Sequence, residues 1–220
     1  MDSLPAGLQL HLGCGPCAPR GWVNVDGALG ARLARHRWLR PWLRRLGLFE
    51  LDWPEDLVIH DLRQRFPWES GSARVVYSSH TLEHLTREDG RRFLAECARV
   101  LAPGGVCRIV VPDLAAILRQ VDKGELRATE LVDALGVSTA DPNDSWWKRL
   151  LAPYVRYPHR CMYDAACLVD AMREAGLDAR VSPPLLSRIP DITDVETTER
   201  ACGALVVEGR KPRATVGALP

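Results

Sequence analysis

Short runs of apolar residues recur along the chain, and each run ends at polar or turn-forming residues. Such runs, rich in Val, Ile and Leu, are typical of buried strands. Five of them lie at residues 8–12, 22–26, 56–62, 73–79 and 106–112. Two later stretches, "ARVSPPLL" and "GALVVEGR", indicate further strands near the C-terminus.

Helical spacing of apolar residues appears between these strands. Residues 81–101 carry apolar side chains three and four positions apart, and the "APGG" that follows predicts a helix end and a turn. The apolar positions are Leu82, Leu85, Phe93, Leu94, Cys97, Val100 and Leu101. Residues 163–177 form a second such pattern, which Gly176 closes. Strands that alternate with helices predict an open α/β sheet with ligands at the carboxyl ends of its strands.

Composition narrows the class of protein. The chain has 220 residues with 46% hydrophobic content, which predicts one domain with one substantial core. Its 29 basic and 28 acidic residues nearly cancel, so no extended basic surface points to nucleic acid. The start lacks a signal sequence, and no apolar run is long enough to span a membrane, which predicts a cytoplasmic protein. Seven scattered cysteines fit reduced thiols better than a disulfide framework.

The most informative stretch is "LHLGCGPCAPRGWVNVD", residues 10–26, where a strand leads into the glycines Gly13 and Gly15. Such a loop normally opens a helix whose N-terminus binds a dinucleotide pyrophosphate. Pro16 and Pro19 remove backbone donors here, and Gly21 weakens any helix. The loop therefore predicts a cofactor without phosphates, bound by glycine backbone and by a carboxylate at the end of the next strand.

Five segments in order resemble a class I S-adenosylmethionine-dependent methyltransferase of the broad type-11 group. They are "LHLGCGP", Asp26, "IHDLRQRFPW", "VVYSSHTLEHL" and "FLAECARVLAPGGVCRIVVPDL". The "GW-N-D" strand directly after the glycine loop and the later "HR-MYD" segment resemble one small subgroup of predicted methyltransferases. The resemblance covers about residues 8–211 and implies a Rossmann-like, doubly wound, mostly parallel seven-stranded sheet. It implies one domain over residues 1–211, followed by a flexible tail at 212–220.

The resemblance also implies how S-adenosylmethionine is bound. Gly13 and Gly15 would lie beneath its methionine part, with the backbone of Leu12 and Cys14 alongside. Asp26 would bind the ribose hydroxyls. The remaining contacts would be Asp61 to the adenine amino group, Leu62 against the ring, and Ser78, Ser79 and His80 beside the sulfonium. His11 stands where an acidic residue is common, which leaves the contact to the methionine amino group open, and Cys17 replaces a frequent third glycine.

Methyl transfer needs an aligned nucleophile and a dry site, and it needs a base only where the nucleophile must lose a proton. His80, directly after the fourth strand, and His159, in "PHRCMYD", are the predicted catalytic residues. Histidine titrates near neutrality, so it can take such a proton. His84 is predicted to pack against backbone instead.

A metal-free site is the prediction, although one alternative stays open. "HTLEH" places two histidines and a glutamate close together, as in inverted zinc-peptidase motifs. On a methyltransferase framework the zinc-peptidase match is coincidental. Some methyltransferases that act on hydroxyls bind a divalent metal with a Glu-His pair at this place, so the resemblance leaves open that His80, Glu83, His84 and His159 ligate one.

Two insertions interrupt the core pattern. Residues 28–55 are arginine-rich, with Trp38 and Trp42, and predict two short helices broken at Pro41. A lid or substrate-recognition role is favoured, and a docking surface or a plain exposed helix is the alternative. Residues 113–160 would add to the substrate side of the pocket. Their aromatic residues, Trp146, Trp147, Tyr154 and Tyr157, could form a wall there or a packing cluster.

These features predict a biosynthetic methyltransferase that acts on a small-molecule, glycan-like or carrier-bound metabolite, with O-methylation first and N-methylation open. Two other functions compete with it. The protein could bind S-adenosylmethionine without transferring its methyl group, or it could be an NAD(P)-dependent reductase. The sequence leaves the acceptor and the oligomeric state undetermined.

Overall fold

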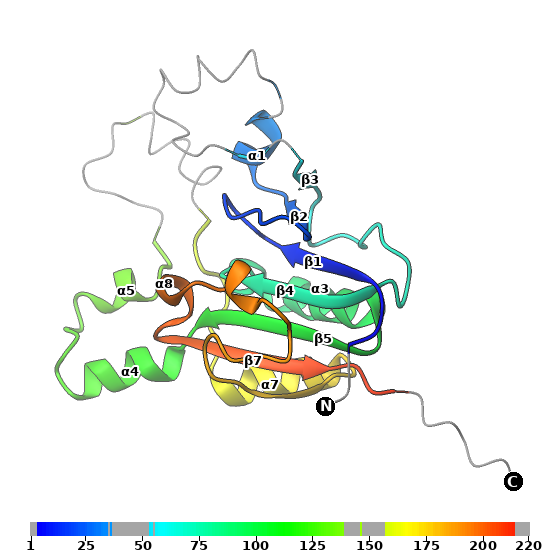
Figure 1. The fold of residues 1–220 in the computed structure, drawn as a ribbon. Coiled ribbons are helices and arrows are strands. Elements are labelled where there is room, and N and C mark those ends of the chain that lie inside the picture. Colours follow the sequence, from blue (N-terminus) through cyan, green and yellow to red (C-terminus); the bar gives the residue numbers. More distant parts are fainter. Residues whose placement is uncertain are drawn as a thin grey trace, which may run out of the picture.

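The computed structural model describes residues 4–34, 36, 53–54, 56–138, 146 and 157–213. Within them a seven-stranded sheet has the order β3-β2-β1-β4-β5-β7-β6 (Figure 1). The strands are β1 (Leu8–Leu12), β2 (Val23–Asp26), β3 (Val58–Ile59), β4 (Ala73–Ser79), β5 (Leu101–Pro112), β6 (Asp178–Val181) and β7 (Ala204–Arg210). The first five run parallel, and β7 is antiparallel to both of its neighbours. The mostly parallel sheet predicted from the sequence is confirmed.

Most of the helices within the described residues are short. They are α1 (Leu29–Ala34), α3 (Arg87–Val100), α4 (Leu114–Asp122), α5 (Leu131–Ala134), α7 (Ala165–Glu174) and α8 (Thr198–Ala201), with 3-10 turns η1 (Leu82–His84) and η2 (Ile192–Asp194). The single helix predicted over 81–101 is thus a 3-10 turn followed by α3. Extended backbone at Leu85 separates the two, and the Thr86 hydroxyl caps α3 by accepting from the Asp89 N–H.

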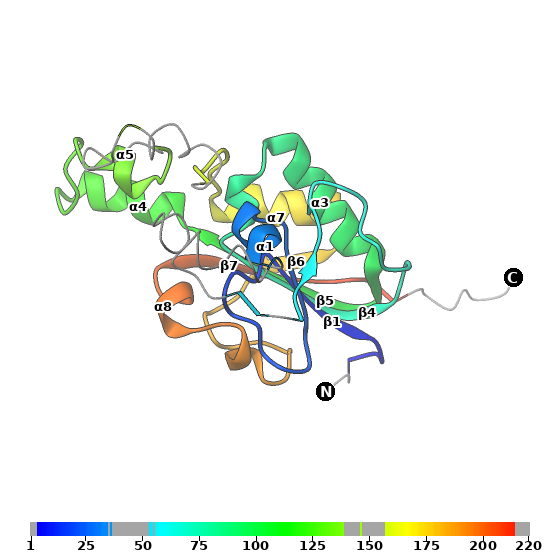
Figure 2. The ribbon, with the colours of Figure 1, turned by 90° about the horizontal axis from the view of Figure 1, so that it is seen from above.

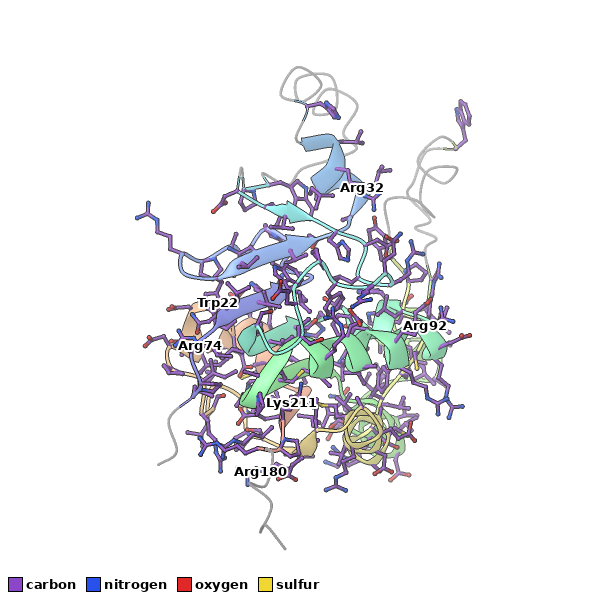
Figure 3. The ribbon with its side chains drawn as sticks, turned by 90° about the vertical axis from the view of Figure 1, so that its right-hand side faces the viewer. Trp22, Arg32, Arg74, Arg92, Arg180 and Lys211 are labelled. Carbon is purple, nitrogen blue, oxygen red and sulfur yellow. The ribbon has the colours of Figure 1, made fainter. Side chains whose placement is uncertain are left out.

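The two faces of the sheet are covered differently (Figure 2). On one face α3 and α7 bury Phe93, Leu94 and Met172 against strand residues such as Leu10 and Ile109. The Lys211 ammonium donates to carbonyls at the end of α3, which ties the chain after β7 to that helix (Figure 3).

The other face carries no long helix within the described residues. Ile189, Ile192 and Val195 pack there against Trp22 and Tyr77. The segment between β6 and β7, which includes η2 and α8, therefore covers the face of the sheet opposite to α3 and α7 (Figure 2).

A buried ion network anchors this covering segment. Arg108 of β5 donates through Nε and Nη2 to the two carboxylate oxygens of Glu196, both at 2.7 Å, and through Nη1 to Glu208 at 3.2 Å. The side chains of Arg108 and Glu196 are fully buried. The same guanidinium donates to the Pro183 carbonyl, so both ends of the segment are held to the sheet.

The chain order puts a topological switch between β1 and β4, because β2 and β3 lie to one side of this pair and β5 to the other. In open α/β sheets ligands bind at such a point, beyond the carboxyl ends of the strands. The carboxyl ends of β4 and β5 face the side of the molecule that carries α4, α5 and α8 (Figure 1).

Candidate functional site

The glycine loop leaves β1 at the switch point and does not enter a helix. Residues 13–22 are turns and irregular backbone, as Pro16 and Pro19 predict. The N–H groups of Gly13 and Cys14 both donate to the Val25 carbonyl, at 2.8 and 3.1 Å. The loop is therefore folded back on β2 and offers no helix N-terminus for a pyrophosphate.

Gly13 and Gly15 both have left-handed backbone, with φ of +69° and +57°. A Cβ on Gly13 would lie 2.0 Å from the Thr81 hydroxyl, which belongs to the segment after β4. Ser78, at the end of β4, donates to the Leu12 carbonyl at 2.9 Å. The ends of β1 and β4 are thus in close contact, and only glycine fits at position 13.

Two carboxylates stand at the ends of the next strands. Asp26 accepts from the Gly15 N–H at 3.0 Å and from the Ala28 N–H at 2.8 Å, so it fixes the loop as well as the exit from β2. Asp61, two residues after β3, is held by the Arg63 guanidinium at 2.7 and 2.9 Å. This hydrogen bonding lowers the pKa of Asp61. Both carboxylates keep lone pairs for further donors.

His80 is the first residue beyond β4 and has left-handed backbone, with φ of +52°. Its Nδ1 lies 3.2 Å from a Glu83 carboxylate oxygen, and its Nε2 lies 2.9 Å from the Arg200 carbonyl. The hydrogen bond to Glu83 raises the pKa of His80. Because both neighbours are acceptors, the arrangement favours a doubly protonated ring. Such a ring has no free lone pair for a substrate proton while these contacts last.

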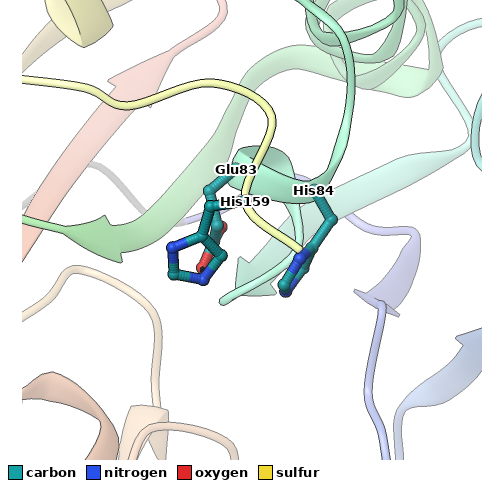
Figure 4. A group of neighbouring side chains, drawn as sticks. All are labelled: Glu83, His84 and His159. Atoms are coloured by element: carbon teal, nitrogen blue, oxygen red, sulfur yellow. Dashed lines mark ion pairs between the residues drawn. The ribbon is translucent and has the colours of Figure 1, made fainter. Parts of the chain in front are cut away.

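His159 and His84 lie beside Glu83, with their rings 4.9 Å apart (Figure 4). The backbone N–H groups of Arg160 and Cys161 donate to the Glu83 carbonyl at 2.7 and 3.1 Å, which joins the 157–161 segment to the η1 turn. His84 follows the prediction of a residue packed against backbone, because its Nδ1 is 3.4 Å from the Pro158 carbonyl. Burial lowers the pKa of His84.

Parts of both insertions lie outside the described residues: 35, 37–52 and 55 in the first, and 139–145 and 147–156 in the second. Trp38, Pro41, Trp42, Trp147 and Tyr154 lie there, so the predictions of a lid and of an aromatic wall remain predictions. Of the first insertion α1 is described, and its Arg32 donates to the Gly27 carbonyl (Figure 3). Of the second, the Tyr157 hydroxyl accepts from the Leu29 N–H at 3.0 Å. The two insertions therefore meet above the end of β2.

Sequence reasoning missed one residue of this site. Arg200 of α8 places a guanidinium nitrogen 3.5 Å from where a Cβ on Gly15 would lie, and its carbonyl contacts His80. No acidic side chain among the described residues pairs with this guanidinium. A lone arginine in a four-residue helix gives no periodic signal, and its place beside the loop follows from the Arg108 network.

His11 of β1 stands where the resemblance implies an acidic residue, and it lies on the face of the sheet that the segment between β6 and β7 covers. It is fully buried between Trp22 and Tyr77. Burial lowers the pKa of His11 to about 4, with partial compensation from Asn24.

We therefore expect stability to fall as the pH drops from 6.5 toward 4. The unfolded chain binds a proton on His11 in this window and the folded chain does not, which costs up to about 3 kcal/mol. Urea unfolding of the wild type and of His11→Gln between pH 4 and 7 measures this. The variant should have a smaller slope than the wild type, because the lowered pKa of His11 no longer contributes to it. An equal slope in wild type and His11→Gln would contradict the interpretation.

The fold and the site together describe an α/β protein whose glycine loop lies at the switch point of the sheet and offers no helix N-terminus. Residues 10–109 match the family described as a methyltransferase domain. This match confirms the resemblance to methyltransferases over that part of the chain. No sequence among the curated proteins matches the chain.

Solved structures show the same fold. One chain from the complex of the Trm112 methyltransferase activator with a methyltransferase of Haloferax volcanii has 19% identity and a TM-score of 0.50, over 97% of this chain and 86% of its own. An O-methyltransferase family protein from Burkholderia thailandensis has 13% identity and a TM-score of 0.50, over 96% of this chain and 52% of its own. The predicted class I methyltransferase fold is thus confirmed.

The site fits S-adenosylmethionine better than a dinucleotide. The loop presents the left-handed glycines Gly13 and Gly15, and the Asp26 carboxylate stands beside it at the end of β2. No described helix is both long and apolar enough to cross a membrane.

Proposed function

We propose that the chain transfers a methyl group from S-adenosylmethionine to a hydroxyl of a small-molecule, glycan-like or carrier-bound acceptor. The observation that carries the proposal is the Gly13–Gly15 loop, which meets Thr81 at the switch point and has no helix behind it. The carboxylates of Asp26 and Asp61 stand beside it at the ends of the neighbouring strands. A phosphate-free adenosyl cofactor uses all of these groups.

When bound, S-adenosylmethionine supplies a methyl carbon activated by its sulfonium. The protein has to align the acceptor and exclude water from that carbon. We expect Ser78, Ser79 and His80 to border it, because they end the strand next to the glycine loop. His80, held between Glu83 and Arg200, positions the turn that carries Glu83 and does not accept the proton.

His159 is the better candidate for a direct part in catalysis. Its Nδ1 lies 2.7 Å from the Leu135 carbonyl, which accepts a hydrogen bond from it. The proton is therefore on Nδ1, and Nε2 keeps a free lone pair 4.0 Å from the Glu83 carboxylate. Through Nε2 this residue can act on an acceptor hydroxyl beside the methyl group.

Exchange of Asp61 for alanine tests the adenine contact. We expect S-adenosylmethionine to bind about 10 to 150 times more weakly, since a hydrogen bond to a charged group contributes roughly 1.5 to 3 kcal/mol. Asp61→Asn keeps an acceptor and should lose less. Calorimetric titration of both variants, with Asp122→Ala on α4 as a surface control, gives the values. Unchanged affinity in Asp61→Ala would remove this residue from the site.

Arg200 is the candidate residue for binding the methionine end of the cofactor. We propose that its guanidinium binds the carboxylate there, because it lies beside Gly15 and lacks an acidic partner among the described residues. Arg200→Gln should then weaken S-adenosylmethionine and S-adenosylhomocysteine about 10 to 100 times. 5′-Methylthioadenosine, which lacks the amino-acid part, should bind wild type and variant equally. Equal losses for all three ligands would mean that Arg200 only supports the loop.

The reaction itself is tested by S-adenosylhomocysteine release in the presence of panels of hydroxyl and amine compounds. Release that depends on a hydroxyl compound supports the proposal. Release with amines alone would reassign the enzyme to N-methylation. Tight cofactor binding with no release for any acceptor would favour a binding protein without catalysis.

A further inference from the structure

Three side chains that can ligate a metal converge beyond the end of β4. Glu83, His84 and His159 each offer one ligand atom, and these atoms all lie within 4.8 Å of one another. Glu83 and His84 come from the η1 turn, and His159 comes from the segment hydrogen-bonded to it. Their side chains point into the same space (Figure 4).

The two histidines are oriented in the way that metal-binding histidines usually are. Nδ1 of His159 faces the Leu135 carbonyl at 2.7 Å, and Nδ1 of His84 faces the Pro158 carbonyl at 3.4 Å. A carbonyl only accepts, so each neutral ring carries its proton on Nδ1 and keeps the lone pair on Nε2. Metal-ligating histidines commonly donate their other N–H to a backbone carbonyl, which fixes the ring and its tautomer.

Glu83 supplies a buried negative charge. Its side chain is 1% exposed, and its Oε2 has no hydrogen-bond partner within the described part of the chain. Its Oε1 is 3.2 Å from Nδ1 of His80 and 4.0 Å from Nε2 of His159. A buried carboxylate oxygen without a donor is a costly group unless a cation or a ligand satisfies it.

We propose that Glu83, His84 and His159 bind one divalent transition metal ion. Two imidazoles and one carboxylate leave coordination positions open for water or substrate, as in catalytic zinc sites. Imidazole ligands favour zinc, cobalt or iron over magnesium. Metal–ligand bonds of about 2.0 to 2.2 Å require the three atoms to move somewhat closer than they are here.

The role of the ion rests on the proposed methyl transfer. A substrate hydroxyl at an open position loses its proton more easily, because the cation stabilises the oxyanion, and the proton passes to solvent water. The oxygen then forms a bond to the methyl carbon while the bond from that carbon to sulfur breaks, and S-adenosylhomocysteine leaves. His159 acts as a ligand in this scheme. Hydroxyl acceptors gain more from such an ion than amines do.

Titration of the metal-free 220-residue chain with Co²⁺ tests the site. Calorimetry should give one equivalent bound, and the visible spectrum should show ligand-field bands without thiolate charge-transfer bands. Glu83→Gln and His159→Ala should each bind Co²⁺ at least about tenfold more weakly. Glu88→Gln on the surface of α3 and Cys17→Ser in the Cys14–Cys17 pair should bind as the wild type does. Thermal unfolding shows whether each variant is folded. If Glu83→Gln or His159→Ala is not folded, His84→Gln is tested in its place.

Three results would overturn the proposal: no Co²⁺ binding, equal binding by folded Glu83→Gln and wild type, or loss of binding in Cys17→Ser. S-adenosylmethionine binding is measured on the same metal-free samples and separates the two proposals. If the protein binds the cofactor but not Co²⁺, the proposed function stands and the metal site is refuted. If the protein binds Co²⁺ at these residues but not the cofactor, the metal site stands and the proposed function is refuted.

Discussion

Exchange of Glu196 for alanine is expected to lower the free energy of unfolding by about 3 to 5 kcal/mol, because it leaves a buried arginine without its main partner. Arg108 makes two hydrogen bonds of 2.7 Å to this carboxylate. Glu208 remains nearby, at 3.2 Å, and cannot replace both. The Glu196 carboxylate also accepts from the Leu185 N–H at 2.6 Å, so the covering segment loses a second anchor.

Urea unfolding of wild type, Glu196→Ala and Glu199→Ala measures this loss. Glu199 is an exposed residue of α8, and its exchange should change the free energy of unfolding by less than about 0.5 kcal/mol. Glu196→Ala should also weaken S-adenosylmethionine binding, since the segment that it anchors carries Arg200. A loss below about 1 kcal/mol would mean that the covering segment is held by apolar packing alone.

Gly13→Ala is the second change with a large expected effect. The new methyl group would lie 2.0 Å from the Thr81 hydroxyl oxygen and 2.7 Å from its methyl carbon, so either β1 or the turn after β4 must move. Left-handed backbone adds about 1 to 2 kcal/mol for a residue with a Cβ, and overpacking adds about 1 to 3 kcal/mol. The free energy of unfolding should fall by the sum, and cofactor affinity should fall with the displaced loop.

Gly15→Ala is the matched control. Its φ of +57° carries the same backbone cost, but the nearest atom to its Cβ is a mobile guanidinium nitrogen of Arg200 at 3.5 Å. It should therefore be destabilised by only about 1 to 2 kcal/mol. Thermal or urea unfolding of both variants, with calorimetric titration of S-adenosylmethionine, gives the comparison. Equal effects at the two positions would show that contact with Thr81 is not what demands glycine at position 13.

The central strands could be predicted because their side chains are buried on both faces. β1 matches its predicted range of 8–12, and β4 its range of 73–79, where every residue but one is buried. β3 is only Val58–Ile59 within the predicted 56–62, since it lies at the edge and pairs with one neighbour. β5 begins at Leu101 instead of Val106, because "APGG" forms an irregular start that still pairs with β4.

The absence of a helix after Gly15 could also be predicted, because proline acts locally through its own backbone. What replaces that helix could not be. Residues 189–195 cover the face of the sheet that α3 and α7 leave open. The ion pair that anchors them joins Arg108 to Glu196, which is 88 positions away in the sequence. Single charged residues at such separation leave no pattern in a sequence.

The prediction for His80 shows the same limit at the site. Its position directly after β4 followed from the motif, whereas its two acceptor neighbours come from η1 and from the distant α8. The cluster of Glu83, His84 and His159 was partly foreseen from "HTLEH", but the carbonyls that orient both rings are contributed by Leu135 and Pro158. Tertiary contacts therefore decide which histidine is free to act.

Calorimetric titration of the purified wild-type protein with S-adenosylmethionine, S-adenosylhomocysteine and NADH tests the interpretation of the glycine loop most directly. We predict that the first two bind in the micromolar range and that NADH does not bind, because the loop has no helix N-terminus for a pyrophosphate. Binding of NADH without binding of either adenosyl ligand would contradict the assignment of this site to S-adenosylmethionine.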